Sequence, residues 1–323
     1  VGEVAVVGHL AQSLAEGGAQ GRSRHSPRVG EGHGLQQLLG GPLLGLAVVS
    51  QAVVVVLEVG LARRACSVSH SGMTQVDLNS DMGEGFGPWC MGDDAALLDI
   101  VSSANVACGF HAGDPNVMHE TMRLAVANGV GIGAHPGFAD LKGFGRRKLP
   151  LPHNEIANDV AYQLGAAQAV AKRAGGTVRH LKLHGALSNM ASVDHALARA
   201  CYQAALDVDP DIVIMVLAAT AMEDVVRELA CNWAGEIFAD RAYNDDATLV
   251  DRALPNAVLH DAEIAAPRIL KMLEAGAIIA ESGAHIPCQI DTICLHGDTP
   301  GAVAMARGIR LHLTNAGVTI ARL

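Results

Sequence analysis

Polar side chains recur where apolar, strand-like runs of this chain end. They occur in the segments DLNSD, CGFH, GAHP, KLHG, FADR and CLHGD. Carboxylates and imidazoles transfer protons near neutral pH, whereas Lys and Arg stabilise negative charge that develops on oxygen. A single polar strand end carries little information, but several that meet at one face of a closed barrel build a pocket. The segments therefore predict one catalytic pocket formed by many strand ends.

The alternation of side chains along a strand sorts these polar groups by face, because residues two apart point the same way. Asp77, Asn79 and Asp81 share one face of the first strand, and Lys182 and His184 share one face of a later strand. A buried row of polar groups is costly unless its members pair with one another or with a ligand. We therefore expect these residues to face the interior of the fold.

The elements that position these groups alternate from Met73 onward between strand-like runs and amphipathic helical stretches, which is typical of an α/β fold with parallel strands. The expected strands are Gln75–Asp81, Ser103–Phe110, Val130–Ala134, Val178–His184, Asp211–Leu217, Gly235–Asp240 and Thr292–His296, with an eighth candidate at Val318–Leu323. The clearest helical stretches are 116–128, 154–174 and 262–275. No GxGxxG follows the first strand and no GxxxxGK[ST] occurs, so a Rossmann or P-loop fold is disfavoured.

Charge and cysteine content narrow the class of protein. The formal net charge is -10 and no basic run is present, so a nucleic-acid partner is not expected. The seven cysteines are scattered and form no CxxC pair. This usage is typical of a reducing cytoplasm, without a disulfide framework or a zinc knuckle. We therefore expect a cytoplasmic protein.

Residues 1–72 differ in composition from the remainder of the chain. They contain no Lys, Asp, Asn, Ile, Thr, Phe, Tyr, Trp or Met, yet hold 13 of the 36 glycines. We expect Met73 to be the natural initiator and 1–72 to form no packed domain. The alternative is a membrane segment at Pro42–Arg64. Gln51 and Glu58 disfavour it, because a charge inside the bilayer costs about 2.5 to 3.5 kcal/mol.

Six longer segments carry a family resemblance. They are DLNSDMGEGFGPW, SANVACGFHAGDP, GAHPGFADLKGFGRR, KLHGALSN, EIFADRAYNDDATLVDR and ICLHGDTP. In this order and spacing the chain resembles the LamB/YcsF family from about Gln75 to its end, and 1–72 have no counterpart in it. The family usually has Pro and Tyr where this chain has Leu183 and Ser188, and Gly where it has Ala247. These differences concern local loop shape more than the reaction.

The resemblance implies a (β/α) barrel of about seven parallel strands, related to the glycoside hydrolase and deacetylase barrels. It also implies a part in the ATP-dependent opening of 5-oxo-L-proline to L-glutamate, performed together with two further subunits, B and C. ATP with Mg²⁺ is then a co-substrate, and no tightly bound cofactor is expected. A stand-alone, metal-dependent deacetylase or amidohydrolase of similar fold is the alternative. Neither activity requires a membrane.

Opening a lactam requires a base, stabilisation of an oxyanion or phosphate, and a clamp for the substrate carboxylate. With the resemblance in place, the candidate catalytic residues are Asp77, Asn79, Asp81, Glu84, His111, His135, Lys182 and His184. The candidates for binding substrate or phosphate are Asn105, Arg146, Asp240, Arg241 and His296. If a metal is bound, its expected ligands are Asp81 with two of His111, His135 and His184.

Several residues of these segments have structural alternatives. For Lys182, the alternative to an oxyanion contact is an ion pair with Asp77 or Asp81. Surface pairing is the expected role of Arg147. Cys108 is expected to pack in the core. Asp114 precedes a proline where a helix would begin, so we expect it to cap that helix rather than act as an acid.

Overall fold

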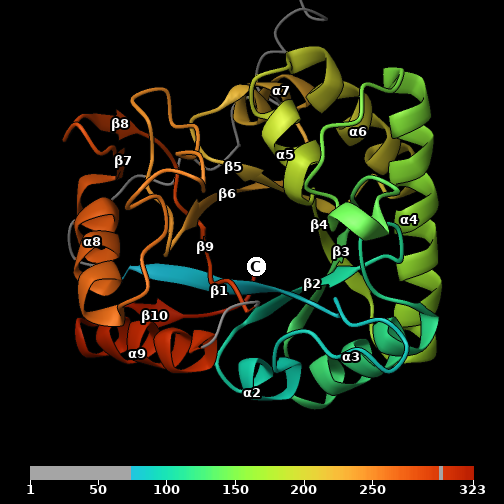
Figure 1. Ribbon diagram of the computed structural model, residues 1–323, viewed down its shortest axis with the longest axis horizontal. Helices are drawn as coiled ribbons and strands as arrows, with labels where there is room; N and C mark the ends of the chain where they lie inside the picture. The colour runs from blue at the N-terminus through green and yellow to red at the C-terminus, as the bar shows by residue number, and fades with distance from the viewer. Residues whose placement is uncertain (1–73, 298–300) are drawn as a thin grey trace, which may run out of the picture. The chain divides into compact units, whose positions relative to one another are not determined.

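A computed structural model describes residues 74–297 and 301–323 (Figure 1). The expectation that 1–72 form no packed domain and precede the native start lies outside the described residues. Within the described ranges, no helix is long and apolar enough to cross a bilayer. Six cysteines of the described residues are free thiols.

A closed ring of parallel strands forms the centre of the fold (Figure 1). The ring runs through β1 (Gln75–Met82), β2 (Ser103–Ala107), β3 (Gly131–His135), β4 (Val178–Lys182), β5 (Val213–Leu217), β6 (Trp233–Phe238) and β9 (Thr292–Cys294). It closes because β9 pairs in parallel with both β6 and β1. The expected barrel of about seven parallel strands is confirmed.

Helices cover the outside of the ring (Figure 1). They are α2 (Asp94–Leu98), α3 (Pro115–Ala127), α4 (His153–Arg173), α5 (Gly185–Ala191), α6 (His195–Val208), α7 (Ala221–Leu229), α8 (Ala262–Ala275) and α9 (Ala302–Asn315), with a 3₁₀ turn η1 (Leu141–Gly143). Helix α3 begins as expected, since the Asp114 carboxylate accepts hydrogen bonds from the backbone N–H groups of Asn116 and Val117. A separate antiparallel hairpin joins β7 (Ala277–Ile279) to β8 (His285–Pro287).

The structure places the carboxyl ends of four expected strands earlier than predicted. Strand β6 ends at Phe238 rather than Asp240, and β9 ends at Cys294 rather than His296. Strand β2 ends at Ala107 because Gly109 has a φ of +91°, which turns the chain away from the sheet. His111 is therefore held by a loop, and strand alternation does not determine its direction. Strand β4 ends at Lys182, and His184 is the residue that precedes helix α5. The eighth candidate is only β10 (Thr319–Ile320), which pairs with the start of β1 outside the ring.

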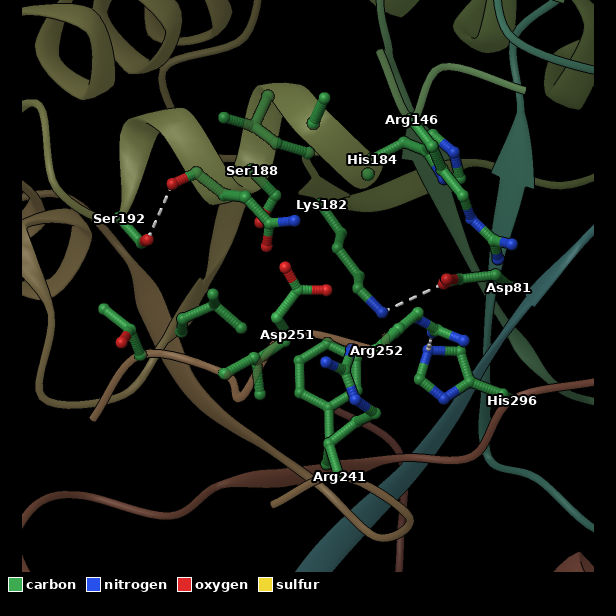
Figure 2. A pocket seen from close by; sticks show the side chains of 18 of the residues that line it. Asp81, Arg146, Lys182, His184, Ser188, Ser192, Arg241, Asp251, Arg252 and His296 are labelled. Carbon is green, nitrogen blue, oxygen red and sulfur yellow. Dashed lines mark hydrogen bonds and ion pairs between the residues drawn. The ribbon is translucent and has the colours of Figure 1, made fainter. Parts of the chain in front are cut away.

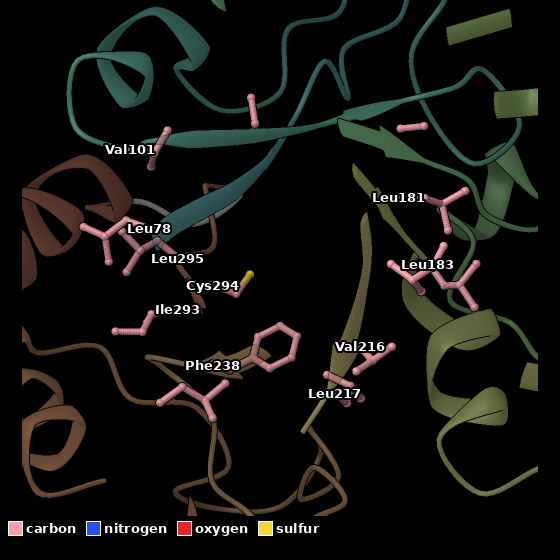
Figure 3. Close-up of a cluster of buried hydrophobic side chains, with 14 of the residues drawn as sticks. Leu78, Val101, Leu181, Leu183, Val216, Leu217, Phe238, Ile293, Cys294 and Leu295 are labelled. Atoms are coloured by element: carbon pink, nitrogen blue, oxygen red, sulfur yellow. The ribbon is translucent and has the colours of Figure 1, made fainter. Parts of the chain in front are cut away.

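The two faces of each strand differ as the alternation predicts. Outward-facing apolar side chains such as Leu78, Leu181 and Ile293 are fully buried beneath the helices (Figure 3). The inward face is largely polar and equally buried, so hydrogen-bonded side chains fill most of the barrel, together with the apolar Met215 and Phe238. Space for them depends on small residues: Gly133 lies beside His180 in the register of β3 and β4, and the imidazole occupies the place of a Cβ at position 133.

Replacing Gly133 by Ala is expected to destabilise the barrel. The added Cβ would overlap the buried His180 ring, and overpacking of a filled core costs about 1 to 3 kcal/mol. Urea unfolding measures the change. Gly165→Ala in α4 is the control, because no atom lies within 4 Å of the added carbon and Ala favours a helix. An unchanged unfolding midpoint for Gly133→Ala would contradict this packing.

Candidate active site

A cavity of about 610 Å³ opens at the carboxyl ends of the barrel strands (Figure 2). Its walls come from strand ends and from the loops that follow them, as the polar segments predict. Among the lining residues are Asp81, Glu84, His135, Arg146, Lys182, His184, Arg241 and His296. Eight of the predicted site residues therefore meet at one cavity.

Lys182 carries a buried positive charge at the floor of this cavity. Its Nζ lies 2.9 Å from Asp81 Oδ1 and 2.9 Å from Glu236 Oε1, and the side chain is 6% exposed. Burial by itself lowers the pKa of this ammonium, but the surrounding negative charges, that of Asp81 above all, raise it well above its ordinary value. Of the two pairings considered for Lys182, the structure forms the one with Asp81.

The pKa of the Asp81 carboxylate is shifted in the opposite direction, downward. Burial favours its neutral form, but the neighbouring His135 and the charge of Lys182 outweigh burial and hold its pKa well below the ordinary value. Asp81 is thus an anion at neutral pH, and its side chain remains 14% exposed to the cavity. The pair places a fixed negative and a fixed positive charge side by side.

Glu236 completes this arrangement, although the sequence reasoning missed it. It is 2% exposed, and burial raises its pKa against the opposing charge of Lys182. A glutamate inside the apolar run of β6 was the available signal, since alternation places it on the same face as Asp240. Cys294 was also missed, and its Sγ lies 3.1 Å from Lys182 Nζ.

Two predicted residues form the layer beneath the cavity. Asn105 donates from Nδ2 to Asn79 Oδ1 at 2.7 Å and to Asp81 Oδ1 at 2.9 Å. Asn79 in turn donates to Glu236 Oε1 at 3.0 Å. Both amides are fully buried, so they position Asp81 and Glu236 and do not line the cavity.

Asp77 lies near the opposite end of the barrel. Its carboxylate accepts hydrogen bonds from the hydroxyls of Ser102, Ser103 and Thr292 at 2.6 to 2.8 Å. Burial raises its pKa despite these bonds. Four residues along a strand span about 13 Å, so Asp77 shares the inward face of Asp81 but not its depth. The structure does not bring Asp77 to the cavity.

Three imidazoles and a carboxylate gather on one side of the cavity. His135 Nε2 lies 3.0 Å from His184 Nδ1 and 3.3 Å from Asp81 Oδ2. The ring of His111 stacks on that of His184 with centroids 3.7 Å apart. Glu84 Oε1 is 3.7 Å from His111 Nε2. Donor atoms of Glu84 and the three histidines lie within 4.8 Å of one another, a set that can hold a metal ion.

Burial keeps two of these rings neutral. It lowers the pKa of His184 to about 3, and it lowers the pKa of His111 well below the ordinary value, with the neighbouring His184 acting in the same direction. Neutral imidazoles accept protons or bind cations through a free lone pair. This side of the cavity therefore offers lone pairs to a cation, and the charge of Arg146 also acts on these rings.

The facing side of the cavity contains His296 and two arginines, Arg241 and Arg252 (Figure 2). The predicted residue Asp240 pairs with His296 but does not line the cavity. His296 Nδ1 donates to Asp240 Oδ1 at 2.7 Å, and Arg252 Nη2 lies 3.2 Å from His296 Nε2. Burial raises the pKa of Asp240, but the charge of His296 outweighs it, so the pKa lies below the ordinary value. Arg252 was not singled out from the sequence, although it ends one of the recognised segments.

Arg241 is held rigidly by the backbone. Its Nη2 donates to the Val250 carbonyl at 2.6 Å and its Nε donates to the Ala257 carbonyl at 3.3 Å. Burial, together with the nearby charge of Arg252, lowers its pKa to about 10, so the guanidinium remains a cation. A fixed guanidinium is suited to holding a carboxylate or a phosphate.

The two neighbouring arginines of the GFGRR segment separate as expected. Arg147 pairs with Asp140, whereas Arg146 lines the cavity with its guanidinium 4.9 Å from the centre of the Phe144 ring. Cys108 is buried in the core, and burial raises the pKa of its thiol to about 12, which suits packing rather than attack on a substrate.

The same arrangement of segments is found in known proteins. The LamB/YcsF family profile matches residues 76–323. The 5-oxoprolinase A-subunit of Ruegeria pomeroyi is 67% identical over 248 residues, 77% of this chain and 98% of that protein. Its counterpart from Rhodopseudomonas palustris is 54% identical over 250 residues, with 77% and 98% covered. The crystal structure of the lactam utilization protein from Thermus thermophilus matches with a TM-score of 0.73 and 41% identity, covering 77% of this chain and 100% of that one.

Replacing Lys182 by Met is expected to cost about 3 to 5 kcal/mol of unfolding free energy, because two buried carboxylates lose their counter-charge. Adding Glu236→Gln should recover part of the loss by removing one of these charges. Arg123→Ala is the control, since its pair with Glu120 is exposed and such pairs contribute less than about 1 kcal/mol. If Lys182→Met alone were as stable as the wild type, the fold would not depend on the charge of Lys182.

His180 should make the barrel sensitive to acid. Burial, together with the charge of Lys182, lowers its pKa from 6.5 to about 3. The unfolded chain therefore binds one more proton between these values, and stability falls by about 1.4 kcal/mol per unit as pH drops below 6.5. His180→Gln keeps the donor to Asn105 and should lower the slope in urea unfolding between pH 7 and 5 by about 1.4 kcal/mol per unit, while His111 and His184 still contribute to it. The exposed His195→Gln is the control, and an identical slope in His180→Gln would refute the assignment.

Proposed function

Because the chain belongs to the LamB/YcsF family, we propose that it is the lactam-binding subunit of a 5-oxoprolinase. The reaction opens 5-oxo-L-proline to L-glutamate with hydrolysis of ATP. One observation carries the proposal for this chain: the oppositely charged Lys182 and Asp81 lie at the floor of a cavity whose opposite wall is cationic. The names of the relatives support a hydrolase that acts on a lactam.

The substrate has one permanent charge, its carboxylate. Arg241 lines the cavity in a conformation held by two backbone carbonyls, and Arg252 lies beside His296 on the same side (Figure 2). Guanidinium groups hold carboxylates through paired hydrogen bonds. We place the substrate carboxylate against these arginines, which turns the lactam ring toward Lys182 and Asp81.

The reacting amide needs groups with opposite roles. Lys182 is held as a cation, so it serves to stabilise negative charge on the amide oxygen and does not serve as a base. Asp81 is held as an anion, so it accepts a hydrogen bond from the ring N–H or from attacking water. Asn79 and Asn105 act beneath them as positioning residues, because their amides fix the carboxylates of Asp81 and Glu236.

ATP is needed to activate the lactam, because an amide is resonance-stabilised and has a poor nitrogen leaving group. In the proposed sequence the γ-phosphoryl group passes from ATP to the lactam oxygen, which releases ADP. Water then adds to the ring carbon, and the C–N bond breaks to free the amino group of glutamate and leave an acyl phosphate. A second water hydrolyses this acyl phosphate to the side-chain carboxylate and inorganic phosphate. Mg²⁺ accompanies ATP, as in other phosphoryl transfers. Subunits B and C complete the proposed assembly, and the free thiols of this chain fit a cytoplasmic location.

The decisive assay measures 5-oxoproline-dependent release of phosphate by this chain alone and with subunits B and C. Asp81→Asn and Lys182→Met should each lower turnover by about 10²-fold or more, the effect of removing a preorganised electrostatic group. Arg123→Ala on exposed α3 should retain the wild-type rate. Full activity in Asp81→Asn would refute the assigned site, and ATP-independent release of acetate from N-acetylated sugars would favour a deacetylase instead.

A further inference from the structure

Two ring nitrogens on the imidazole side of the cavity face each other across 3.0 Å, namely His135 Nε2 and His184 Nδ1. This is the distance of a hydrogen bond, which requires a proton on one of the two atoms. Which atom carries a proton follows from the partner of the other nitrogen in each ring.

Both partners are backbone carbonyls. His135 Nδ1 lies 2.8 Å from the Lys182 oxygen, and His184 Nε2 lies 2.8 Å from the Phe144 oxygen. A carbonyl oxygen only accepts, so His135 carries its proton on Nδ1 and His184 carries its proton on Nε2. In neutral rings the two facing nitrogens are then both bare lone pairs. Two lone pairs held 3.0 Å apart repel unless a cation lies between them.

We propose that a divalent transition-metal ion binds here, with His135 Nε2 and His184 Nδ1 as its nitrogen ligands. Carboxylates supply the charge it needs: Asp81 Oδ2 is 3.3 Å from His135 Nε2, and Glu84 Oε1 is 3.9 Å from His184 Nδ1. Mixed imidazole and carboxylate sets are typical ligands of first-row divalent ions. The backbone carbonyls complete the design, since ligand histidines usually donate their second N–H to a fixed acceptor.

The spacing of the nitrogens favours one coordination geometry. Two nitrogens 3.0 Å apart, each about 2.1 Å from one ion, subtend about 90° at that ion, the angle between neighbouring ligands of an octahedral shell. Two imidazoles and the carboxylates leave positions for water or substrate in such a shell. Ions that accept six ligands, such as Mn²⁺ and Co²⁺, fit this site better than an ion restricted to four.

His111 provides an independent indication of an absent polar group. It is 1% exposed, and neither of its ring nitrogens has a hydrogen-bond partner within residues 74–297 and 301–323. Because its ring stacks nearly parallel on His184, 3.7 Å away, both rings cannot point a lone pair at the same ion in their planes. A water molecule on the ion would instead give His111 its partner.

The other group of donor atoms near the cavity is a poorer site for a cation. It comprises Asp81, Cys294 and His296. Lys182 Nζ already lies 2.9 Å from Asp81 and 3.1 Å from the Cys294 sulfur, so a second positive charge would be repelled there. Asp81 presents its other oxygen, Oδ2, to the imidazole side, and therefore serves both cations without competition for one atom.

The proposal is tested by Co²⁺ binding to the full chain, without ATP, lactam or other subunits. After treatment with a chelator, the wild type should bind one equivalent of Co²⁺, followed by calorimetry and by the visible absorption of the ion. Excess Mn²⁺ should displace it. Because the readout is binding, its outcome is independent of whether the chain belongs to a 5-oxoprolinase.

Two variants remove a ligand nitrogen while keeping the backbone hydrogen bond. His135→Asn retains a donor at the position of Nδ1, and His184→Gln retains one at the position of Nε2. Each should weaken Co²⁺ binding at least tenfold, the lower range for loss of a metal-site contact. His195→Gln, in an exposed pair on α6, is the matched control and should bind like the wild type.

Circular dichroism checks that both variants fold. The number of Co²⁺ ions bound by the wild type tests the proposal even if a variant does not fold. Absence of Co²⁺ binding to the folded wild type would overturn the proposal and leave a shared proton between the two rings. Binding that is undiminished in both variants would also overturn it, since the ion would then lie elsewhere.

Discussion

The buried ammonium of Lys182 is the constraint on which the rest of the barrel interior depends. A lysine inside a protein is costly unless negative charge is held at contact distance, and here Asp81 and Glu236 both lie 2.9 Å away. These carboxylates must in turn be hydrogen-bonded, which explains the buried amides of Asn79 and Asn105. These polar residues thus form a connected network in which ion pairs and hydrogen bonds offset much of the cost of desolvation.

That network determines which side chains have room. Its members replace the branched apolar residues that usually fill a small parallel barrel. The buried ring of His180 occupies the space that a side chain at position 133 would need, so this position is a glycine. Most apolar packing lies on the outward faces, where residues such as Leu181 and Ile293 meet the helices, and Met215 and Phe238 add apolar surface to the inward face.

The same charges divide the cavity into two sides with different preferences. On one side, neutral imidazoles and the carboxylates of Asp81 and Glu84 favour a cation. On the other side, Arg241 and Arg252 favour an anion. Lys182 lies at the floor between the two sides (Figure 2). The proposed orientation of a small, negatively charged lactam, with its carboxylate toward the arginines and its amide above the ion pair, matches this division of charge.

Local sequence was sufficient to predict parallel strands that alternate with helices, the inward direction of Asp77, Asn79 and Asp81, and the cap at Asp114, because strand periodicity and capping depend on neighbours in the chain. The closed barrel was implied by the family resemblance. Depth along the barrel and the identity of partners depend on how separate strands are placed in register when the ring closes. Register placed Asp77 far from the cavity and brought Glu236 to Lys182. His111 lies in a loop, where strand periodicity does not apply. The proton positions on His135 and His184 depend on the backbone carbonyls of Lys182 and Phe144, which are distant in sequence. Only the folded chain brings these groups together.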